Sequence, residues 1–71
     1  MTIGSQIEQM RRFAGLTQAQ LSERSGVNQA IISALERGKR NCTIATLESL
    51  AEGLQMDLRY TFTPKDWSND K

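Results

Sequence analysis

Residues 16–40 of the chain read LTQAQLSERSGVNQAIISALERGKR, and this stretch decides the fold. Thr17 begins a T-x-x-Q capping box with Gln20, in which each side chain satisfies a free amide at the start of a helix. Gly26 suits the left-handed conformation of a tight turn, because glycine has no Cβ. Asn28 is a favoured N-cap for the helix that follows. The stretch therefore predicts two helices of about nine and ten residues that are joined by a short turn.

Apolar side chains mark the inner faces of these two helices. We expect Ala19 and Leu21 to make the apolar contacts of the first, with the small Ala19 at the point where the helices cross closely. We expect Val27 in the turn to be buried and to fix the angle between the helices together with Ile32, while Leu35 completes the inner face of the second. Two helices joined in this way match the helix-turn-helix unit, whose second helix enters the major groove of DNA.

Helical periodicity extends on both sides of this stretch. The apolar residues before it recur at helical spacing and end before Gly15; they are Ile3, Ile7, Met10 and Ala14. Thr43 caps a further predicted helix after it. The apolar stripe of that helix comprises Ile44, Leu47, Leu50, Ala51 and Leu54. The chain is therefore expected to be mainly α, with its helices within residues 1–55.

The periodicity changes from helix to strand after Gly53. Apolar and polar residues alternate over residues 56–63, which is typical of a β-strand, and the apolar positions are Met56, Leu58, Tyr60 and Phe62. Pro64 ends the alternation, and residues 64–71 are interpreted as a polar tail whose Trp67 either docks on the domain or lies loose. One strand cannot satisfy its own backbone hydrogen bonds, so we expect it to pair with the same strand of a second subunit.

The composition limits how so small a domain is stabilised. A chain of 71 residues buries only about 60% of the surface that its unfolded form exposes. Cys42 is the only cysteine and histidine is absent, so an internal disulfide is impossible and a metal site would need carboxylates alone. No acidic cluster has the spacing for one, and we expect neither a metal nor another cofactor. Association with a second copy is then the expected source of further stability.

The same features bear on the compartment and on catalysis. One unpaired cysteine fits a reducing cytoplasm, and Cys42 is expected to be an inert packing or loop residue rather than a redox switch. The N-terminal residues show no basic region followed by an apolar run, and no apolar run approaches the ~20 residues of a membrane span. We expect a cytoplasmic protein that contacts no membrane. An enzyme is not expected, because the common general base, histidine, is missing and nothing activates Cys42.

Charge is unevenly distributed along the chain. Six basic and two acidic residues lie within residues 11–40, although the whole chain has a formal net charge of only +1. A basic segment within a nearly neutral chain indicates that a polyanion meets one face. An ordinary solvated face would have the same composition, so charge alone does not decide the partner.

The quoted stretch resembles the lambda-repressor/Cro type of helix-turn-helix domain, also called the XRE family. The LTQ opening, the SGV turn, the IS within the next helix and the ERGKR ending all stand at the family's spacing. The resemblance covers residues 3–54. It implies a four-helix lambda-repressor-like domain, and the strand that we expect to pair across a dimer follows that domain.

The resemblance also implies roles for particular residues. Gln18 would contact a phosphate and brace Gln29, and the residues that read base edges would be Gln29, Ala30 and Ser33. Gln29 suits adenine, and Ala30 suits the methyl group of thymine. Asn28 would hold the DNA backbone through its side chain or the helix N-terminus. The loop that grips phosphates would comprise Arg37, Lys39, Arg40 and Asn41.

Each of these residues also has an interpretation without DNA. Gln18 and Gln29 suit a solvated helix surface, Ala30 is a good helix former, and Ser33 is a small structural residue. The basic loop also suits solvent, although phosphate binding is favoured. Ile31 departs from the small polar residue usual at its position, so it either meets a thymine methyl or packs inward, and packing is favoured.

Arg11 and Glu36 are expected to have a structural role and not to contact DNA. In the family, the arginine that matches Arg11 pairs with the glutamate that matches Glu36, so we expect a structural ion pair here. Arg12, one position further on, points elsewhere and would be able to reach a phosphate.

These features predict a sequence-specific DNA-binding regulator, a repressor that binds a palindromic operator as a homodimer. Two recognition helices on a two-fold axis need half-sites about one helical turn, ~34 Å, apart. The alternative is an antitoxin that neutralises a toxin protein and represses its own operon, because a compact domain with a dimerising strand resembles the Hip-type antitoxins. Restriction-modification controllers share the domain but tend to end in a further helix. A protein-interaction module would lack the polar and basic residues present at positions 18, 29 and 37–40.

Overall fold

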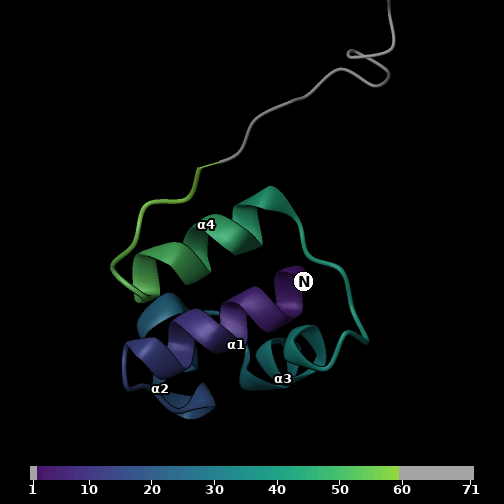
Figure 1. Cartoon of the computed structure of the whole chain (residues 1–71), viewed down its shortest axis with the longest axis horizontal. Coiled ribbons are helices and arrows are strands. Elements are labelled where there is room, and N and C mark those ends of the chain that lie inside the picture. Colours follow the sequence, from purple (N-terminus) through teal and green to yellow (C-terminus); the bar gives the residue numbers. More distant parts are fainter. Residues whose placement is uncertain (1, 60–71) are drawn as a thin grey trace, which may run out of the picture.

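The structure, a computed structural model, describes residues 2–59. Four helices follow one another along this part of the chain: α1 (Ile3–Phe13), α2 (Gln18–Ser25), α3 (Gln29–Glu36) and α4 (Ile44–Gly53). α2 packs against α3 and α4, and α1 packs against α3 (Figure 1). The predicted four-helix arrangement is confirmed. Among residues 2–59, no helix has the length and apolar character needed to cross a membrane.

Side-chain caps fix where the helices begin, and the three predicted caps are Thr17, Asn28 and Thr43. The hydroxyl of Thr17 accepts the Gln20 N–H at 3.0 Å, and the Gln20 Oε1 accepts the Thr17 N–H at 2.8 Å. Asn28 accepts the Ala30 N–H at 2.7 Å. The turn between α2 and α3 passes through Gly26 at φ 76°, as its predicted left-handed conformation requires. Each of these interactions spans at most three residues, which is why the sequence encodes them.

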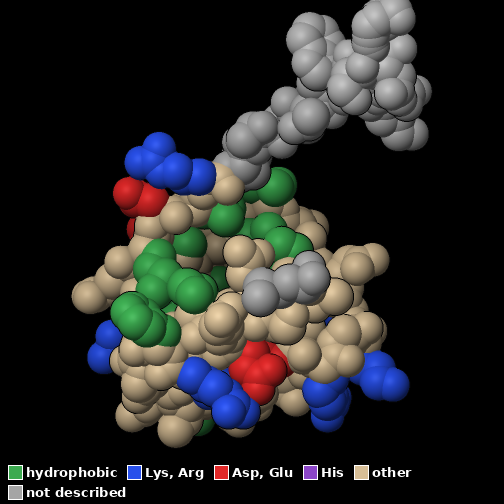
Figure 2. Space-filling model, viewed as in Figure 1, with side chains coloured by type: hydrophobic (Ala, Val, Ile, Leu, Met, Phe, Trp, Pro, Cys, Tyr) green, Lys and Arg blue, Asp and Glu red, His purple; other side chains and the backbone are tan. Residues whose placement is uncertain are grey.

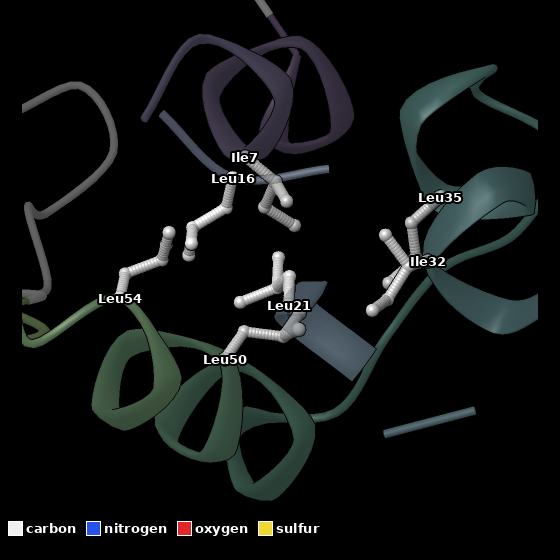
Figure 3. Close-up of a cluster of buried hydrophobic side chains, with 7 residues drawn as sticks. All are labelled: Ile7, Leu16, Leu21, Ile32, Leu35, Leu50 and Leu54. Carbon is white, nitrogen blue, oxygen red and sulfur yellow. The ribbon is translucent and has the colours of Figure 1, made fainter. Parts of the chain in front are cut away.

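Seven buried apolar side chains form the core (Figure 3): Ile7, Leu16, Leu21, Ile32, Leu35, Leu50 and Leu54. They come from all four helices, from the turn before α2 and from the residue after α4. Burying each one stabilises the fold by about 1.5–3 kcal/mol. Three predicted stripe residues are exposed instead: Ile3 at 48%, Ile44 at 45%, and Ala14 at the end of α1.

The prediction that Ala19 packs at the helix crossing is wrong, because Ala19 is exposed. An α-helix has 3.6 residues per turn, so the fully buried Leu21, two residues away, points to the opposite side of α2. The close approaches occur at two glycines instead. A Cβ added to Gly4 in α1 would overlap the backbone carbonyl of Leu35, and one added to Gly53 in α4 would lie 2.9 Å from the Cβ of Ser25.

Because of the contact at Gly4, we expect the substitution of this glycine by alanine to lower the stability of the fold, whereas the same substitution usually raises it in a helix. Replacing a helical glycine by alanine normally gains about 0.5–1 kcal/mol. Gly4→Ala is expected to lose about 1–3 kcal/mol in urea denaturation, because the methyl group must displace the backbone of α3. Gln9→Ala, at an exposed position of the same helix, serves as the control and should change stability little. A stabilised Gly4→Ala protein would show that α1 does not lie this close to α3.

The segment after α4 leaves the helix through Gln55, whose φ is 58°. Met56 and Leu58 are half-buried, whereas Asp57 and Arg59 are exposed. Burial therefore alternates along residues 56–59. None of these four residues is in a β-strand, and Tyr60, Phe62 and the tail with Trp67 lie outside the described residues, so the strand stays a prediction.

Candidate nucleic-acid interface

The first turn of α3 presents the residues expected to read bases. Asn28, Gln29 and Ala30 are exposed, and Ser33 is half-buried. Residues three and four apart share a helix face, so Ser33 continues the surface begun by Gln29 and Ala30. Ile32 and Leu35 occupy the opposite face and are buried in the core. The structure thus brings the expected base-reading residues together on the outward face of a helix whose inner face is fixed.

The loop after α3 begins where Gly38 turns the chain at φ 73°. The phosphate-binding residues expected here are all exposed: Arg37, Lys39, Arg40 and Asn41. Within residues 2–59, none of the three cations takes part in a salt bridge. Figure 2 shows one face of the molecule. Basic side chains lie along the half of it that α2 and α3 form, and hydrophobic side chains gather between α1 and α4. The loop therefore offers unpaired positive charge next to the exposed face of α3.

Arg11 and Glu36 form a bidentate ion pair between α1 and α3. Arg11 Nε donates to Glu36 Oε2 at 2.7 Å, and Nη2 donates to Oε1 at 2.9 Å. The third group, Nη1, donates to the carbonyl of Leu16 at 2.8 Å. The side chains are only 11% and 4% exposed. Arg11 is thus turned away from solvent and unavailable to DNA.

The ionisation of this pair follows from its surroundings. Burial alone would raise the pKa of Glu36, but hydrogen bonds from Arg11 and Gln18, with the nearby arginine charges, outweigh it and lower that pKa. The hydrogen bond to Glu36 raises the pKa of Arg11. Both groups therefore stay charged near neutral pH, as a stable buried pair requires.

Gln18 lies at the first position of α2, and its side chain takes part in the same network. Its Nε2 donates to Glu36 Oε1 at 3.0 Å, and the residue is half-buried. Among the described residues no hydrogen bond joins Gln18 to Gln29, so the expected brace between them is absent. Sequence reasoning missed the contact with Glu36, since 18 residues separate the partners.

The structure also places three further residues that the sequence analysis discussed: Arg12, Ile31 and Cys42. The exposed Arg12 forms a salt bridge of 2.8 Å with Glu8, one helical turn earlier, and still faces solvent. Ile31 packs against the core, in agreement with the favoured interpretation. Cys42 also packs there as a free thiol, and burial raises its pKa, which disfavours the reactive thiolate.

A second surface, which sequence reasoning missed, is an apolar groove of about 460 Å³ between α1 and α4. We call it the α1–α4 groove. Its lining includes Ile3, Met10, Ile44, Leu47, Met56 and Leu58. The sequence carried one signal of this groove: the apolar stripes of α1 and α4 contain more residues than the core buries.

The chain is similar to a known protein family and to known regulators. The Helix-turn-helix family HTH_3 matches residues 7–60. The uncharacterized HTH-type transcriptional regulator y4dJ of Sinorhizobium fredii is 44% identical over 64 residues, which cover 90% of this chain and 83% of that protein. The immunity repressor protein of Bacillus phage phi105 is 35% identical over 54 residues, or 76% of this chain but only 38% of the repressor.

A solved structure is similar in both sequence and fold. The crystal structure of the restriction-modification controller protein C.AhdI from Aeromonas hydrophila superimposes with a TM-score of 0.73 at 30% identity. The match covers 76% of this chain and 82% of the controller. The expected similarity to restriction-modification controllers in the helix-turn-helix domain is therefore confirmed.

Proposed function

Because the chain belongs to the helix-turn-helix family HTH_3, of the Cro/lambda-repressor type, we propose that it is a sequence-specific DNA-binding regulator of transcription. One observation carries the proposal: Gln29, Ala30 and Ser33 share the outward face of α3 while Ile32 and Leu35 anchor its inner face. A helix held in this way can enter the major groove without disturbing the core. The relatives named as a regulator and a repressor support a role in repression. We propose that the chain acts in the cytoplasm, and we propose no enzymatic activity.

The proposed contacts divide into base reading and positioning. Gln29 pairs with adenine through its amide, Ala30 meets a thymine methyl, and Ser33 contacts a further base edge. Phosphates are held by Gln18, by Asn28 at the start of α3, and by the loop residues Arg37, Lys39, Arg40 and Asn41. These phosphate contacts carry no sequence information themselves but fix the register of the helix on the duplex.

Selection of bound duplexes from a random DNA pool tests the function directly. A recovered motif with two-fold symmetry and half-sites about one helical turn apart supports the proposal. Recovery of unrelated sequences, at the affinity of random DNA, would contradict it. The selected duplex is also the probe for the variants below.

Gln29→Ala is expected to reduce the discrimination between the selected duplex and a duplex mutated at the contacted base by about 1–3 kcal/mol. The loss arises because the bidentate amide contact with that base disappears. Fluorescence anisotropy on both duplexes measures the change, with Gln9→Ala, an exposed glutamine of α1, as the matched control. An equal loss on both duplexes would instead make Gln29 a positioning residue.

We also propose that two copies associate through the α1–α4 groove and the segment after α4. The groove remains apolar and open although Met56 and Leu58 already line it, and Ile3 and Ile44 are exposed. Burial alternates over residues 56–59, so in a strand that extends to residue 63 Tyr60 and Phe62 would share the face of Met56 and Leu58. Pairing of two such strands would cover both grooves and give each strand a hydrogen-bonding partner along one edge.

A truncation after Arg59 tests the dimer. It removes half of the predicted strand but keeps every core residue, whereas a cut after Gly53 would also remove the buried Leu54. We expect sedimentation to show a monomer with weakened binding to the two-half-site duplex. A truncation after Pro64, which keeps residues 56–63, is the control and should remain dimeric. A chain of residues 1–59 that is fully dimeric would remove the strand from the proposal.

The antitoxin alternative is not retained. The relatives and the structure described above are named as a transcriptional regulator, a repressor and a controller protein. The α1–α4 groove is the apolar surface of residues 2–59 that would be open to a protein partner, and we assign it to a second copy of the chain. No other described surface indicates a toxin as partner.

A further inference from the structure

We propose that Glu36 positions the side-chain amide of Gln18 for a DNA phosphate, in addition to stabilising the fold through Arg11. This inference rests on the proposed DNA-binding function. It assigns Glu36 a role through Gln18 and not a contact of its own, because the Glu36 side chain is only 4% exposed.

The geometry joins three side chains from three helices. Glu36 Oε1 in α3 accepts from Gln18 Nε2 of α2 at 3.0 Å and from Arg11 Nη2 of α1 at 2.9 Å. Glu36 Oε2 accepts from Arg11 Nε at 2.7 Å. Arg11 therefore holds the carboxylate in place and balances its charge, so that the carboxylate can hold Gln18 without repelling a nearby phosphate.

The carboxylate determines which end of the Gln18 amide faces inward. An ionised carboxylate only accepts hydrogen bonds, whereas an amide has a donor end and an acceptor end. If the amide were flipped, its oxygen would face the oxygen of Glu36. Nε2 must therefore face Glu36, and the orientation follows from the charge of Glu36.

This orientation leaves a donor for DNA. Nε2 carries two N–H groups, and Glu36 accepts only one of them. Gln18 has no other side-chain hydrogen bond within residues 2–59, is half-buried, and stands at the N-terminal end of α2. The helix dipole favours an anion at that end. Because Glu36 fixes the amide before DNA arrives, less conformational entropy is lost when a phosphate accepts the second N–H.

A double-mutant cycle, which combines protein substitutions with chemically modified DNA phosphates, tests the inference. Methylphosphonate is placed at each phosphate of the selected duplex in turn, and the Gln18 phosphate is the one at which substitution weakens wild-type protein but not Gln18→Leu. We expect a loss of about tenfold there, which corresponds to one hydrogen bond to a charged group. Glu36→Gln should abolish this sensitivity, with affinities expressed per folded protein. Glu52→Gln removes an equal charge at an exposed position of α4 and should leave it intact.

The outcomes separate this role from a purely structural one. A lower folded fraction weakens binding to all duplexes equally, so it cannot remove sensitivity to one phosphate. If Glu36→Gln does not fold, Glu36→Asp keeps the charge for Arg11 but withdraws the oxygen from Gln18, with the same expected loss. Full sensitivity in a folded Glu36 variant would overturn the inference.

NMR of the free protein gives a measurement that does not involve DNA. The NMR chemical shifts of the Gln18 side-chain NH₂ should change with pH at the same midpoint as the Glu36 carboxyl. This change should disappear in Glu36→Gln. Arg11 and Arg12 are the cations that face Glu36, and Glu8 is the carboxylate paired with Arg12, so Glu8→Gln is the control. Gln18 shifts independent of Glu36 would overturn the inference. Absence of DNA binding with these shifts intact would instead contradict the proposed function.

Discussion

Glu36→Ala is expected to lose about 3–5 kcal/mol of unfolding free energy and to populate the unfolded state in buffer. The substitution leaves the guanidinium of Arg11 buried at 11% exposure, with only the Leu16 carbonyl as partner. A domain of this size has a total stability near the lower end of about 5–15 kcal/mol, so the loss is comparable with the whole. DNA binding would then be lost through unfolding.

Urea denaturation followed by circular dichroism measures this loss, and the chain contains a matched control. Glu8→Ala removes the partner of Arg12 in a salt bridge whose arginine is 71% exposed. Exposed pairs contribute only about 0–1 kcal/mol, because water screens them. If the two variants lost similar amounts of stability, burial would not be what makes the Arg11–Glu36 pair important.

The same pair predicts how stability depends on acidity. The folded state lowers the pKa of Glu36 against the opposing effect of burial, so the unfolded chain binds the proton more tightly. The contribution of Glu36 is fully present above its unfolded pKa, about 4.3. It is lost as the pH falls from there through the lower folded pKa. Wild-type stability should therefore decline more steeply below about pH 4.3 than that of Glu36→Gln.

Leu21→Ala is expected to destabilise the domain by about 2–5 kcal/mol. Leu21 has no exposed surface and is the one buried residue of α2, which has only eight residues. A helix that short is not stable alone in water, so α2 depends on this contact for its position against α3 and α4. Thermal denaturation should show a large fall in Tm, with DNA binding lost because α3 is no longer held.

Ala19→Ser, two residues earlier in the same helix, is the control for this substitution. Because Ala19 is exposed, we expect a change within about 0.5 kcal/mol. This pair of variants also tests the corrected orientation of α2. A large loss at Ala19 with little loss at Leu21 would restore the original expectation that Ala19 packs at the helix crossing.

Much of the fold could be predicted because its decisive interactions are local. The caps at Thr17, Asn28 and Thr43, and the left-handed turn at Gly26, involve partners within four residues. The buried positions of α3 also follow from helical spacing, since Ile32 and Leu35 share one face. The exposed residues opposite them were therefore predictable as a surface, but helical spacing does not say which DNA bases such a surface would read.

The stretch of residues 16–40 by itself determined the two helices, their turn and the outward face of α3, because backbone conformation and capping depend on neighbours along the chain. Only the tertiary structure decided that Ala19 faces solvent, that Gly4 meets Leu35 and that Glu36 holds Gln18. It also decided that the wide apolar stripes of α1 and α4 leave a groove between them. These features depend on the angles and distances between helices, which packing sets and no local pattern encodes.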